Sequence, residues 1–315
     1  MAAPDASRRA YARCMNRVLD HIDAHLDAPL DLPALAALAH FSAFHFHRLF
    51  AAWMGETLGA YLQRRRLETA AQRLIQRPRE AVLAVGLGVG FGSGEAFARA
   101  FKLHFGCTPS AWRAAAPQRH AAYLDEQRES LRRVRNLDQD GAAAVDDDGG
   151  QRHPACESTM HVEIKTFPAE RVAYLRLIGP YGPAIARFWQ ERVGPWLAAE
   201  GFTGRPSYGI AHDDPSITPP SQCRYDAAVA VEPDYRASGE TCIAELPGGR
   251  YAVASFLGRA DEIGAAWAEL FRAWLPASGY RCDDRPCFEY YGDPDCFDAA
   301  SGRFSCEICI PVERL

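Results

Sequence analysis

Two segments of the chain, 51 residues apart, each place an arginine between two phenylalanines. They are Phe46–Phe50, which contains Arg48, and Phe97–Phe101, which contains Arg99. On a helix, phenylalanines at i and i+4 share one face and leave the opposite face for polar side chains. An outward arginine there can form two hydrogen bonds with a guanine. The pattern is therefore typical of a helix that reads the edges of base pairs.

The stripe opposite the phenylalanines, at offsets i, i+3, i+4 and i+7, supplies the candidate DNA contacts. These candidates are Phe44, His47, Arg48, Glu95, Arg99 and Lys102. Besides the arginines, Glu95 can accept a hydrogen bond from cytosine, and Phe44 can pack on a thymine methyl group. The simpler interpretation, that the arginines are solvated surface charges, is weakened because the whole pattern occurs twice.

The elements that must position these side chains form an internal repeat. Seven positions recur without a gap: Ser42, Phe46, Arg48, Phe50, Gly55, Thr57 and Tyr61 return as Ser93, Phe97, Arg99, Phe101, Gly106, Thr108 and Trp112. A match of this length indicates that one structural unit is present in two copies.

Each copy predicts two short helices around a tight turn. In the first copy, an apolar helix over 32–39 leads into the turn, and Ser42 then serves as the N-cap of a helix over 43–54. Gly55 is suited to the left-handed position that ends this helix. The second copy repeats the order over 81–106, so the sequence predicts two helix-turn-helix units.

One long helix is expected over 57–76, between the two units, and it contains Arg64-Arg65-Arg66. This basic run has two open interpretations, phosphate contacts or a merely solvated helix face. In the second unit, Gly86 and Gly88 fall within a predicted helix, where each costs roughly 0.5–1 kcal/mol relative to alanine. We therefore expect that helix to be shortened, or the second unit to be loosely folded until DNA engages it.

Charge divides the chain into two unlike parts. Residues 1–120 hold 15 lysines and arginines against 9 acidic residues, whereas residues 121–315 hold 20 against 31. The formal net charge of −5 therefore combines a part at +6 with a part at −11. A basic DNA-binding module tethered to an acidic partner domain has this asymmetry, although solubility alone also accounts for a +6 domain.

Ten cysteines occur in a chain whose N-terminus lacks the apolar segment of a secretion signal. This combination indicates free thiols and a cytoplasmic protein, and the absence of an 18-residue apolar run argues against a membrane span. Cys306 and Cys309 have the spacing of metal ligands, but residues three apart on a strand point to opposite faces. We therefore expect neither a metal site nor a cofactor.

A second repeat, with a period near 79, occupies the acidic part. Phe167–Gly179 resembles Leu246–Gly258, and an aromatic-rich helix follows each copy. The aromatic residues of these helices, which we assign to the core, are Phe188, Trp189, Trp196, Trp267, Phe271 and Trp274. Each copy predicts strand, helix, strand, strand, a unit with one sheet face covered by its helix and one face bare. We expect two such units to place their bare faces around a shared groove.

The groove side of two strands carries the candidate ligand contacts. Alternation along the 287–291 strand places Glu289 and Tyr291 on that side, and alternation along the last strand places Glu307 and Cys309 there. Two carboxylates in an aromatic groove attract an organic cation through charge and cation–π contacts. Two other interpretations of Glu289 stay open, an exposed strand residue or a partner of an arginine.

Several short motifs of the first half coincide with those of a known family. They are Gly90-Phe91-x-Ser93, Phe97, Phe101-Lys102, Phe105-Gly106 and Thr108-Pro109-Ser110. Residues 30–115 thus resemble the DNA-binding domain of AraC/XylS-type transcription regulators. The resemblance implies binding to adjacent major grooves, one recognition helix in each, by a monomer or a dimer.

The second half has its own set of familiar motifs. They are Ile178-Gly179-Pro180-Tyr181, Pro276-x-Ser278-Gly279-Tyr280, Phe288-Glu289-x-Tyr291 and Ile308-Cys309-Ile310-Pro311-Val312. Residues 160–315 thus resemble the GyrI-like effector-binding domain of the Rob/BmrR type, also called a tandem SHS2 module. In that family a glutamate in the groove binds the ligand, and Glu289 is the nearest match here.

Together these patterns predict a multidomain chain. We expect an all-α double helix-turn-helix domain over 10–115, a charged helical or flexible linker over 116–158, and an α+β domain over 159–315. The last would consist of tandem β-α-β-β units with antiparallel sheets.

The predicted function is that of a transcription regulator modulated by a small, cationic or aromatic ligand. Its expected partners are double-stranded DNA and the small-molecule effector, with RNA polymerase as a candidate third and no membrane. We expect no enzyme and assign no catalytic residue, because the sequence offers neither a nucleophile elbow on a strand-to-helix turn nor a metal cluster. The alternatives are a small-molecule hydrolase or a toxin-sequestering module, with DNA binding secondary.

Overall fold

The computed structural model describes residues 3–116, 160–260, 262–293, 296–298 and 301–314. The linker predicted over 116–158 lies, beyond its first residue, outside the described residues. Among the helices of the described part, none combines the length and the apolar character that a bilayer crossing requires.

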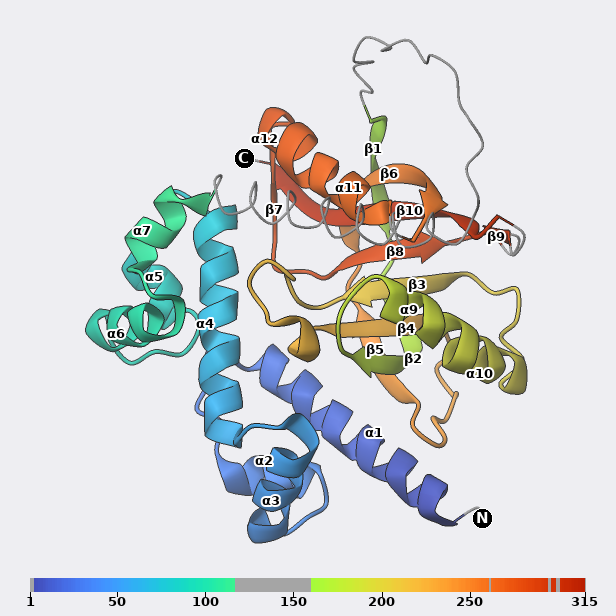
Figure 1. Ribbon diagram of the computed structural model, residues 1–315, viewed down its shortest axis with the longest axis horizontal. Coiled ribbons are helices and arrows are strands. Elements are labelled where there is room, and N and C mark those ends of the chain that lie inside the picture. Colours follow the sequence, from blue (N-terminus) through green and yellow to red (C-terminus); the bar gives the residue numbers. More distant parts are fainter. Residues whose placement is uncertain (1–2, 117–159, 261, 294–295, 299–300, 315) are drawn as a thin grey trace, which may run out of the picture.

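The described N-terminal region is entirely helical (Figure 1). Its helices are α1 (Ala3–Ala24), α2 (Leu32–Leu38), α3 (Ala43–Met54), α4 (Leu58–Gln76), α5 (Val82–Leu87), α6 (Gly94–Phe105) and α7 (Pro109–Ala114). The first half of α4 packs with α1, α2 and α3 around one core, and its second half packs with α5, α6 and α7 around another. The two predicted helix-turn-helix units therefore lie at opposite ends of α4.

Local signals in the sequence determine where the helices of each unit begin and end. The Ser42 hydroxyl accepts a hydrogen bond from the His45 amide, and Ser93 accepts one from Ala96 at 3.1 Å. Gly55 and Gly106 end α3 and α6 in the left-handed conformation, with φ of 73° and 74°. The predicted caps and stops are thus confirmed.

Packing accounts for the glycines of the second unit. Helix α5 ends at Leu87, and Gly88 forms its C-cap, so the helix is short, as expected. A Cβ atom at Gly86 would lie 2.6 Å from the Phe97 ring. The glycine therefore allows α5 to approach α6 closely, which offsets its unfavourable helix propensity.

The C-terminal region is an antiparallel sheet with two helical segments. Its strands are β1 (Val162–Phe167), β2 (Glu170–Ile178), β3 (Ser207–Ala211), β4 (Arg224–Ala230), β5 (Cys242–Leu246), β6 (Gly249–Arg259), β7 (Tyr280–Cys282), β8 (Cys287–Tyr291), β9 (Phe297–Asp298) and β10 (Arg303–Arg314). One helical segment comprises α9 (Pro183–Phe188), η1 (Trp189–Val193) and α10 (Gly194–Ala199), and the other comprises α11 (Ile263–Glu269), η3 (Leu270–Trp274) and α12 (Leu275–Ala277). The 3₁₀ turn η2 (Pro220–Gln222) precedes β4.

The two β-α-β-β repeats form one continuous sheet. The strand order is β1-β6-β10-β8-β3-β4-β2-β5, and β7 and β9 also pair with β10. The third element of each repeat, β3 and β8, pair at the centre and join the two halves. The edge strands are exchanged between the repeats. Strand β1, which precedes the first repeat, pairs with β6 of the second, and β5, which precedes the second repeat, pairs with β2 of the first. The predicted α+β architecture is confirmed.

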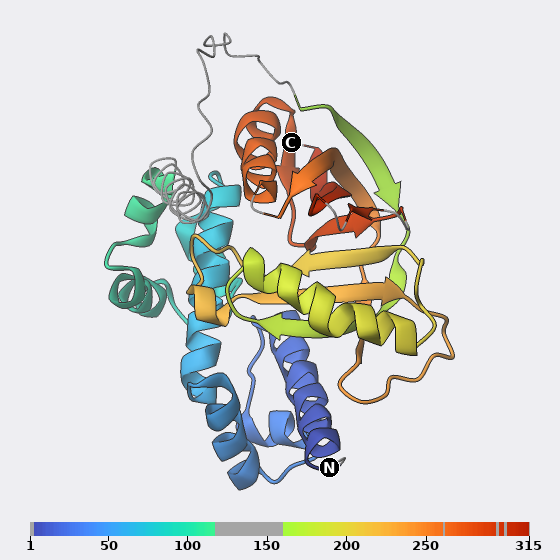
Figure 2. The ribbon, with the colours of Figure 1, turned by 45° about the vertical axis from the view of Figure 1, so that its right-hand side comes forward.

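Both helical segments cover the same face of the sheet (Figure 2). Each contains a π-helical turn at the equivalent position, η1 in the first repeat and η3 in the second. The opposite face carries a second apolar layer that includes Tyr208, Tyr251 and Phe288. The predicted groove between bare faces is therefore absent from the described sheet, because both faces are packed.

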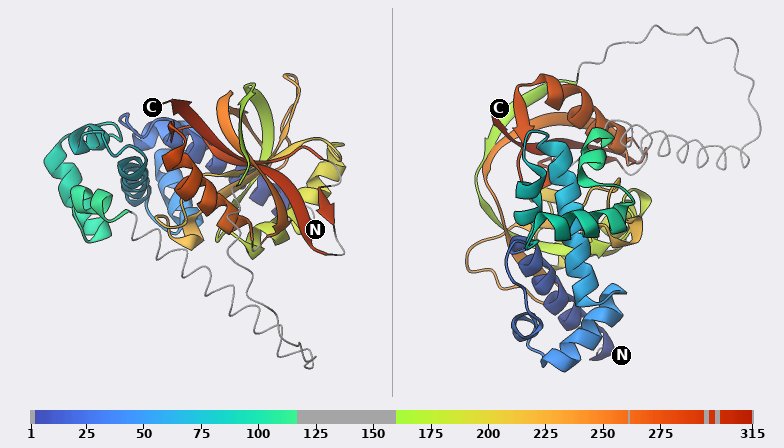
Figure 3. Two further views of the ribbon diagram at one scale, coloured as in Figure 1. Left: turned by 90° about the horizontal axis from the view of Figure 1, so that it is seen from above. Right: turned by 90° about the vertical axis from the view of Figure 1, so that its left-hand side faces the viewer.

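The helical region docks against the sheet through α1 and α4. Figure 3 shows the second helix-turn-helix unit on the side of α4 that is turned away from the sheet. Recognition helix α6 therefore lies away from the sheet, and α3 lies beyond the other end of α4 in Figure 1.

Candidate functional site

The two recognition helices display the predicted DNA contacts outward. Phe44, His47, Arg48, Glu95, Arg99 and Lys102 are all exposed, and none forms an ion pair within the described residues. The four phenylalanines on the opposite faces of α3 and α6 are fully buried. Phe44 is 68% exposed, and the Arg48 guanidinium lies 5.8 Å from its ring centroid. This face combines flat apolar surface with unpaired hydrogen-bond donors.

Two of the three arginines in the basic run of α4, Arg64 and Arg65, are buried, and Arg66 is half-buried. Arg64 forms an ion pair with Glu68 at 3.0 Å, and its side chain is 8% exposed. Arg66 donates a hydrogen bond to the Leu26 carbonyl at 2.9 Å. Phosphate contact and a solvated helix face are therefore both wrong for Arg64 and Arg65, whose guanidinium groups are buried, whereas phosphate contact by the half-buried Arg66 stays a prediction.

The predicted ligand residue Glu289 lies on the helix-covered face of the sheet. Its carboxylate accepts hydrogen bonds from the Tyr291 hydroxyl at 2.7 Å, the Tyr225 hydroxyl at 3.2 Å and the Trp267 indole at 3.2 Å. Trp189 completes the enclosure, with its ring centroid 5.3 Å from that of Tyr291. The structure therefore brings Glu289 and Tyr291 together between the two helical segments.

The charge of Glu289 has no counterion of its own. Within the described residues Glu289 forms no ion pair, so the interpretation that it pairs with an arginine does not hold. Burial raises the pKa of its carboxyl, and the hydrogen bonds from Tyr291, Trp267 and Tyr225 oppose that rise. A desolvated carboxylate with only neutral donors is favourable for a cation that enters from outside.

A glycine on the neighbouring strand makes room for this arrangement. Gly209 of β3 lies opposite Glu289 in the sheet. A Cβ atom at Gly209 would lie 2.0 Å from the Tyr225 hydroxyl oxygen and 2.8 Å from the Glu289 carboxylate. The hydrogen bond between Tyr225 and Glu289 therefore depends on a residue without a side chain at this position.

The two other predicted ligand residues, Glu307 and Cys309, lie on the opposite face. Directly opposed residues of antiparallel strands share a face, and Glu289 is opposed by Ile308, not by either predicted residue. Glu307 instead accepts a hydrogen bond from Lys165 at 2.5 Å, and Cys309 packs in the second apolar layer. The prediction was wrong because both faces of this sheet are apolar, so alternation alone did not indicate which face holds Ile308.

Sequence reasoning also missed two aromatic contacts of Glu289, Trp267 and Tyr225, and the neighbouring Trp189. Trp189 and Trp267 were assigned to the core from their helical spacing, and Tyr225 was not singled out. A signal was present in the repeat, because each copy has a tryptophan near its π-helical turn: Trp189 begins η1, and Trp267 lies in α11 three residues before η3. Such turns occur frequently at functional sites.

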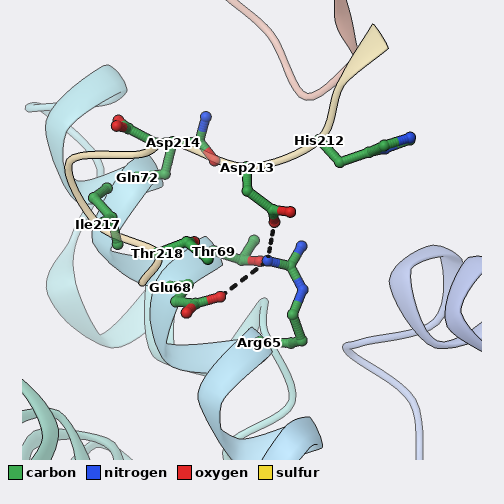
Figure 4. Close-up of a pocket in the computed structure, with 9 residues that line it drawn as sticks. All are labelled: Arg65, Glu68, Thr69, Gln72, His212, Asp213, Asp214, Ile217 and Thr218. Carbon is green, nitrogen blue, oxygen red and sulfur yellow. Dashed lines mark hydrogen bonds and ion pairs between the residues drawn. The ribbon is translucent and has the colours of Figure 1, made fainter. Parts of the chain in front are cut away.

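A cluster of buried charges joins the helical region to the sheet (Figure 4). Arg65 of α4 donates to Asp213, which follows β3, at 2.5 Å. Asp213 also accepts from Arg224 at 2.9 Å, and Arg224 in turn contacts Asp23 of α1. Burial would raise the pKa of the Asp213 carboxyl, but the charges of Arg224 and Arg65 outweigh it and hold this pKa well below its usual range.

A second buried cluster lies nearby on β2 and β4. Arg176 donates two hydrogen bonds of 2.6 Å to Asp226, and it also reaches Asp20 of α1 at 2.9 Å. His212 contacts the same Asp226 carboxylate at 2.6 Å. Because a buried charge is strongly destabilising when its partner is removed, these pairs favour a single docked arrangement of the two regions.

Comparison with known proteins divides the chain in the same way. Residues 160–313 match the family described as the GyrI-like small molecule binding domain, and residues 35–115 match a helix-turn-helix domain family. A DNA gyrase inhibitor of Edwardsiella piscicida is 32% identical over 160 residues, which cover 49% of this chain and 99% of that protein.

Two solved structures are similar to one half each. An AraC-type transcriptional regulator from Chromobacterium violaceum is 28% identical, with a TM-score of 0.31, and covers 32% of this chain and 90% of its own. The EcmrR C-terminal domain is 19% identical, with a TM-score of 0.42, and covers 50% of this chain and 99% of its own. By its matches to family models and curated relatives, the chain belongs to the GyrI-like family and joins that small-molecule-binding domain to an AraC-type helix-turn-helix domain, as a transcription regulator.

Proposed function

We propose that this regulator reads duplex DNA with α3 and α6 and responds to an organic cation bound at Glu289. The proposed DNA contacts are Phe44, His47, Arg48, Glu95, Arg99 and Lys102. The proposed ligand contacts are Glu289, Tyr291, Trp189, Tyr225 and Trp267. The proposed role of both sets is binding, without catalysis.

The spacing of the two recognition helices supports the DNA-binding half of the proposal. They belong to units at opposite ends of α4, whose 19 residues span about 28 Å at the rise of an α-helix. One turn of B-DNA is about 34 Å long, so helices separated by a distance of this order can enter successive major grooves of one duplex. The exposed Arg48 and Arg99 would then each meet the edge of a guanine.

Substitution of one recognition arginine tests this half. We expect Arg48→Ala to weaken binding to a duplex selected by the protein from a random pool by about 1–3 kcal/mol and to relax preference at one base pair. Arg236→Ala, which removes another exposed arginine outside the recognition helices, is the matched control. Unchanged affinity and sequence preference of the Arg48 variant would contradict the assignment.

The ligand-binding part of the proposal rests on the Glu289 carboxylate, which accepts hydrogen bonds but has no counterion among the described residues. Four aromatic rings surround it, and the faces of such rings attract cations at close range. A flat or globular organic cation can therefore satisfy the carboxylate and gain contact with the rings in one site. Because burial raises the pKa of Glu289, cation affinity should fall as the pH decreases through that raised value.

Calorimetry with tetraphenylphosphonium tests the ligand half. We expect Glu289→Gln to reduce affinity at least about tenfold, since it removes the charge and keeps the shape. Glu245→Gln, at an exposed position of β5, should bind as the unaltered protein does. Equal affinity of the Glu289 variant, or equal binding of neutral triphenylphosphine oxide, would exclude a cation site at this residue.

A protein partner for the C-terminal half is a second candidate. The relatives named DNA gyrase inhibitors match that half along almost their whole length. A supercoiling assay with gyrase and the full chain separates the two functions, because inhibition through this half should persist in a variant that carries both Arg48→Ala and Arg99→Ala.

A further inference from the structure

Strand β4 connects the ligand site to the contact between the two regions. Tyr225 points to the helix-covered face, where its hydroxyl bonds Glu289 at 3.2 Å and accepts from the Trp189 indole at 3.1 Å. Its neighbours Arg224 and Asp226 point the other way and hold the two buried charge clusters. Three consecutive residues thus belong alternately to the interface and to the ligand site.

Tyr181 ties the helix over the ligand site to the same interface. Its hydroxyl donates to the Arg224 carbonyl at 2.7 Å and accepts from the Asp213 amide at 3.2 Å. Its ring centroid lies 6.4 Å from that of Tyr225. Two residues later α9 begins, and this helix runs directly into the π-helical turn that starts at Trp189.

The two backbone groups that Tyr181 binds belong to the principal interdomain residues. The Asp213 side chain is fully buried and pairs with Arg65 of α4. The Arg224 side chain is 2% exposed and pairs with Asp23 of α1. A displacement of either residue therefore changes the distances in the ion pairs that join the two regions. Buried ion pairs are stabilising only when their geometry is close to ideal.

We infer that Tyr181 couples occupation of the Glu289 site to the docking of the sheet against α1 and α4. This inference rests on the proposed ligand function. A cation that reaches the Glu289 carboxylate must displace Trp189, since Trp189 lies against Tyr291 and bonds the Tyr225 hydroxyl. The π-helical turn accommodates this shift, and α9 carries it to Tyr181. Withdrawal of the Tyr181 hydroxyl releases Arg224 and Asp213 and loosens the docking.

The coupling is reciprocal by thermodynamic necessity. If the ligand changes the relation of the helical region to the sheet, and DNA prefers one of the two states, DNA and ligand must alter each other's affinity by the same factor. Tyr181 is a positioning residue in this scheme, since it touches neither proposed partner. Its removal should abolish the response and leave ligand binding intact.

Amide hydrogen exchange on the full chain tests the inference. In the unaltered protein, saturating tetraphenylphosphonium should speed exchange in residues 15–24 and 61–72 at least about threefold. In Tyr181→Phe, calorimetry should give the same affinity for this cation within about twofold, but the cation should leave exchange in both segments unchanged. Tyr235→Phe is the matched control, because its hydroxyl bonds Glu200 elsewhere in the same region, and it should respond as the unaltered protein does.

The outcomes separate this inference from the function on which it rests. A normal exchange response in Tyr181→Phe, or binding without any exchange response in the unaltered protein, overturns the coupling alone. Absence of heat with the unaltered protein overturns the proposed ligand class, and the coupling with it. Loss of the response in Tyr181→Phe with retained affinity, and its persistence in Tyr235→Phe, supports the coupling.

Discussion

Both halves of this molecule contain a duplicated unit, but the copies are assembled in opposite ways. In the helical half, each helix-turn-helix unit has its own core and shares only α4 with the other. In the sheet half, the copies join at β3 and β8 and receive edge strands from each other's side. Separate copies can present the same chemistry twice, whereas merged copies create one site at their junction. The DNA-reading face belongs to the first kind and the Glu289 site to the second.

The difference predicts that damage to the sheet half spreads further than damage to either helical unit. The largest effect is expected where the merged sheet meets the helices. Arg224→Ala leaves Arg65 as the remaining arginine partner of both the Asp213 and the Asp23 carboxylate, and it should lower the free energy of unfolding by about 3–5 kcal/mol. Urea denaturation measures this loss. Arg236→Ala serves as the exposed control. A loss below about 1 kcal/mol for Arg224→Ala would mean that the buried ion pairs of the interface contribute no more to stability than surface pairs do.

Acid should weaken the same interface gradually. The folded-state pKa of Asp213 is lowered by Arg224 and Arg65, so its stabilising contribution is complete above the unfolded-state pKa near 4. That contribution is lost as the pH falls below this value. Urea midpoints measured between pH 7 and pH 3 should therefore decrease with acid, and the decrease should be smaller in Asp213→Asn. An equal decrease in both proteins would contradict the role of Asp213.

A smaller effect is expected at the junction of the two β repeats. Gly209→Ala introduces a methyl group against the Tyr225 hydroxyl and the Glu289 carboxylate, which should cost about 1–3 kcal/mol and also weaken cation binding. Gly264→Ala is the matched control, since a Cβ atom at that position of α11 meets nothing within 4 Å. Unaltered stability and binding in the Gly209 variant would mean that the site tolerates rearrangement.

The smallest effect should stay within one helical unit. Ser93→Ala removes the hydroxyl that caps α6 and should cost about 1 kcal/mol. Hydrogen exchange should quicken in α5 and α6 but not in α2 and α3, because the two units have separate cores. Ser110→Ala, an exposed position of α7, is the control. Equal quickening of both units would show that they are not independent.

Sequence predicted the helical half better than the sheet half for a physical reason. Ser42, Ser93, Gly55 and Gly106 act within a few residues of themselves, so caps and stops can be identified from neighbours in the chain. The face on which a strand residue lies depends on packing by distant segments. Alternation therefore placed Glu289 and Tyr291 together, but it failed in β10, where both faces are packed.

The buried arginines show a second limit of sequence reasoning. Arg65 and Arg48 are the same residue type on neighbouring helices, yet Arg65 pairs with Asp213, 148 positions along the chain, and Arg48 is exposed. No pattern among neighbouring residues distinguishes an arginine that forms ion pairs between two regions from an exposed arginine that can contact DNA. Only the internal repeat distinguished the two arginines, because Arg48 recurs as Arg99 whereas Arg65 is not among the repeated positions.

Hydroxyl-radical footprinting tests the central claim most directly. On a duplex selected from a random pool, the protein should protect two patches on one side of the DNA, about 10 base pairs apart. Arg48→Ala should weaken protection in one patch and Arg99→Ala in the other. A single protected patch, or one patch that both substitutions affect equally, would contradict the reading of neighbouring grooves by two separate helices.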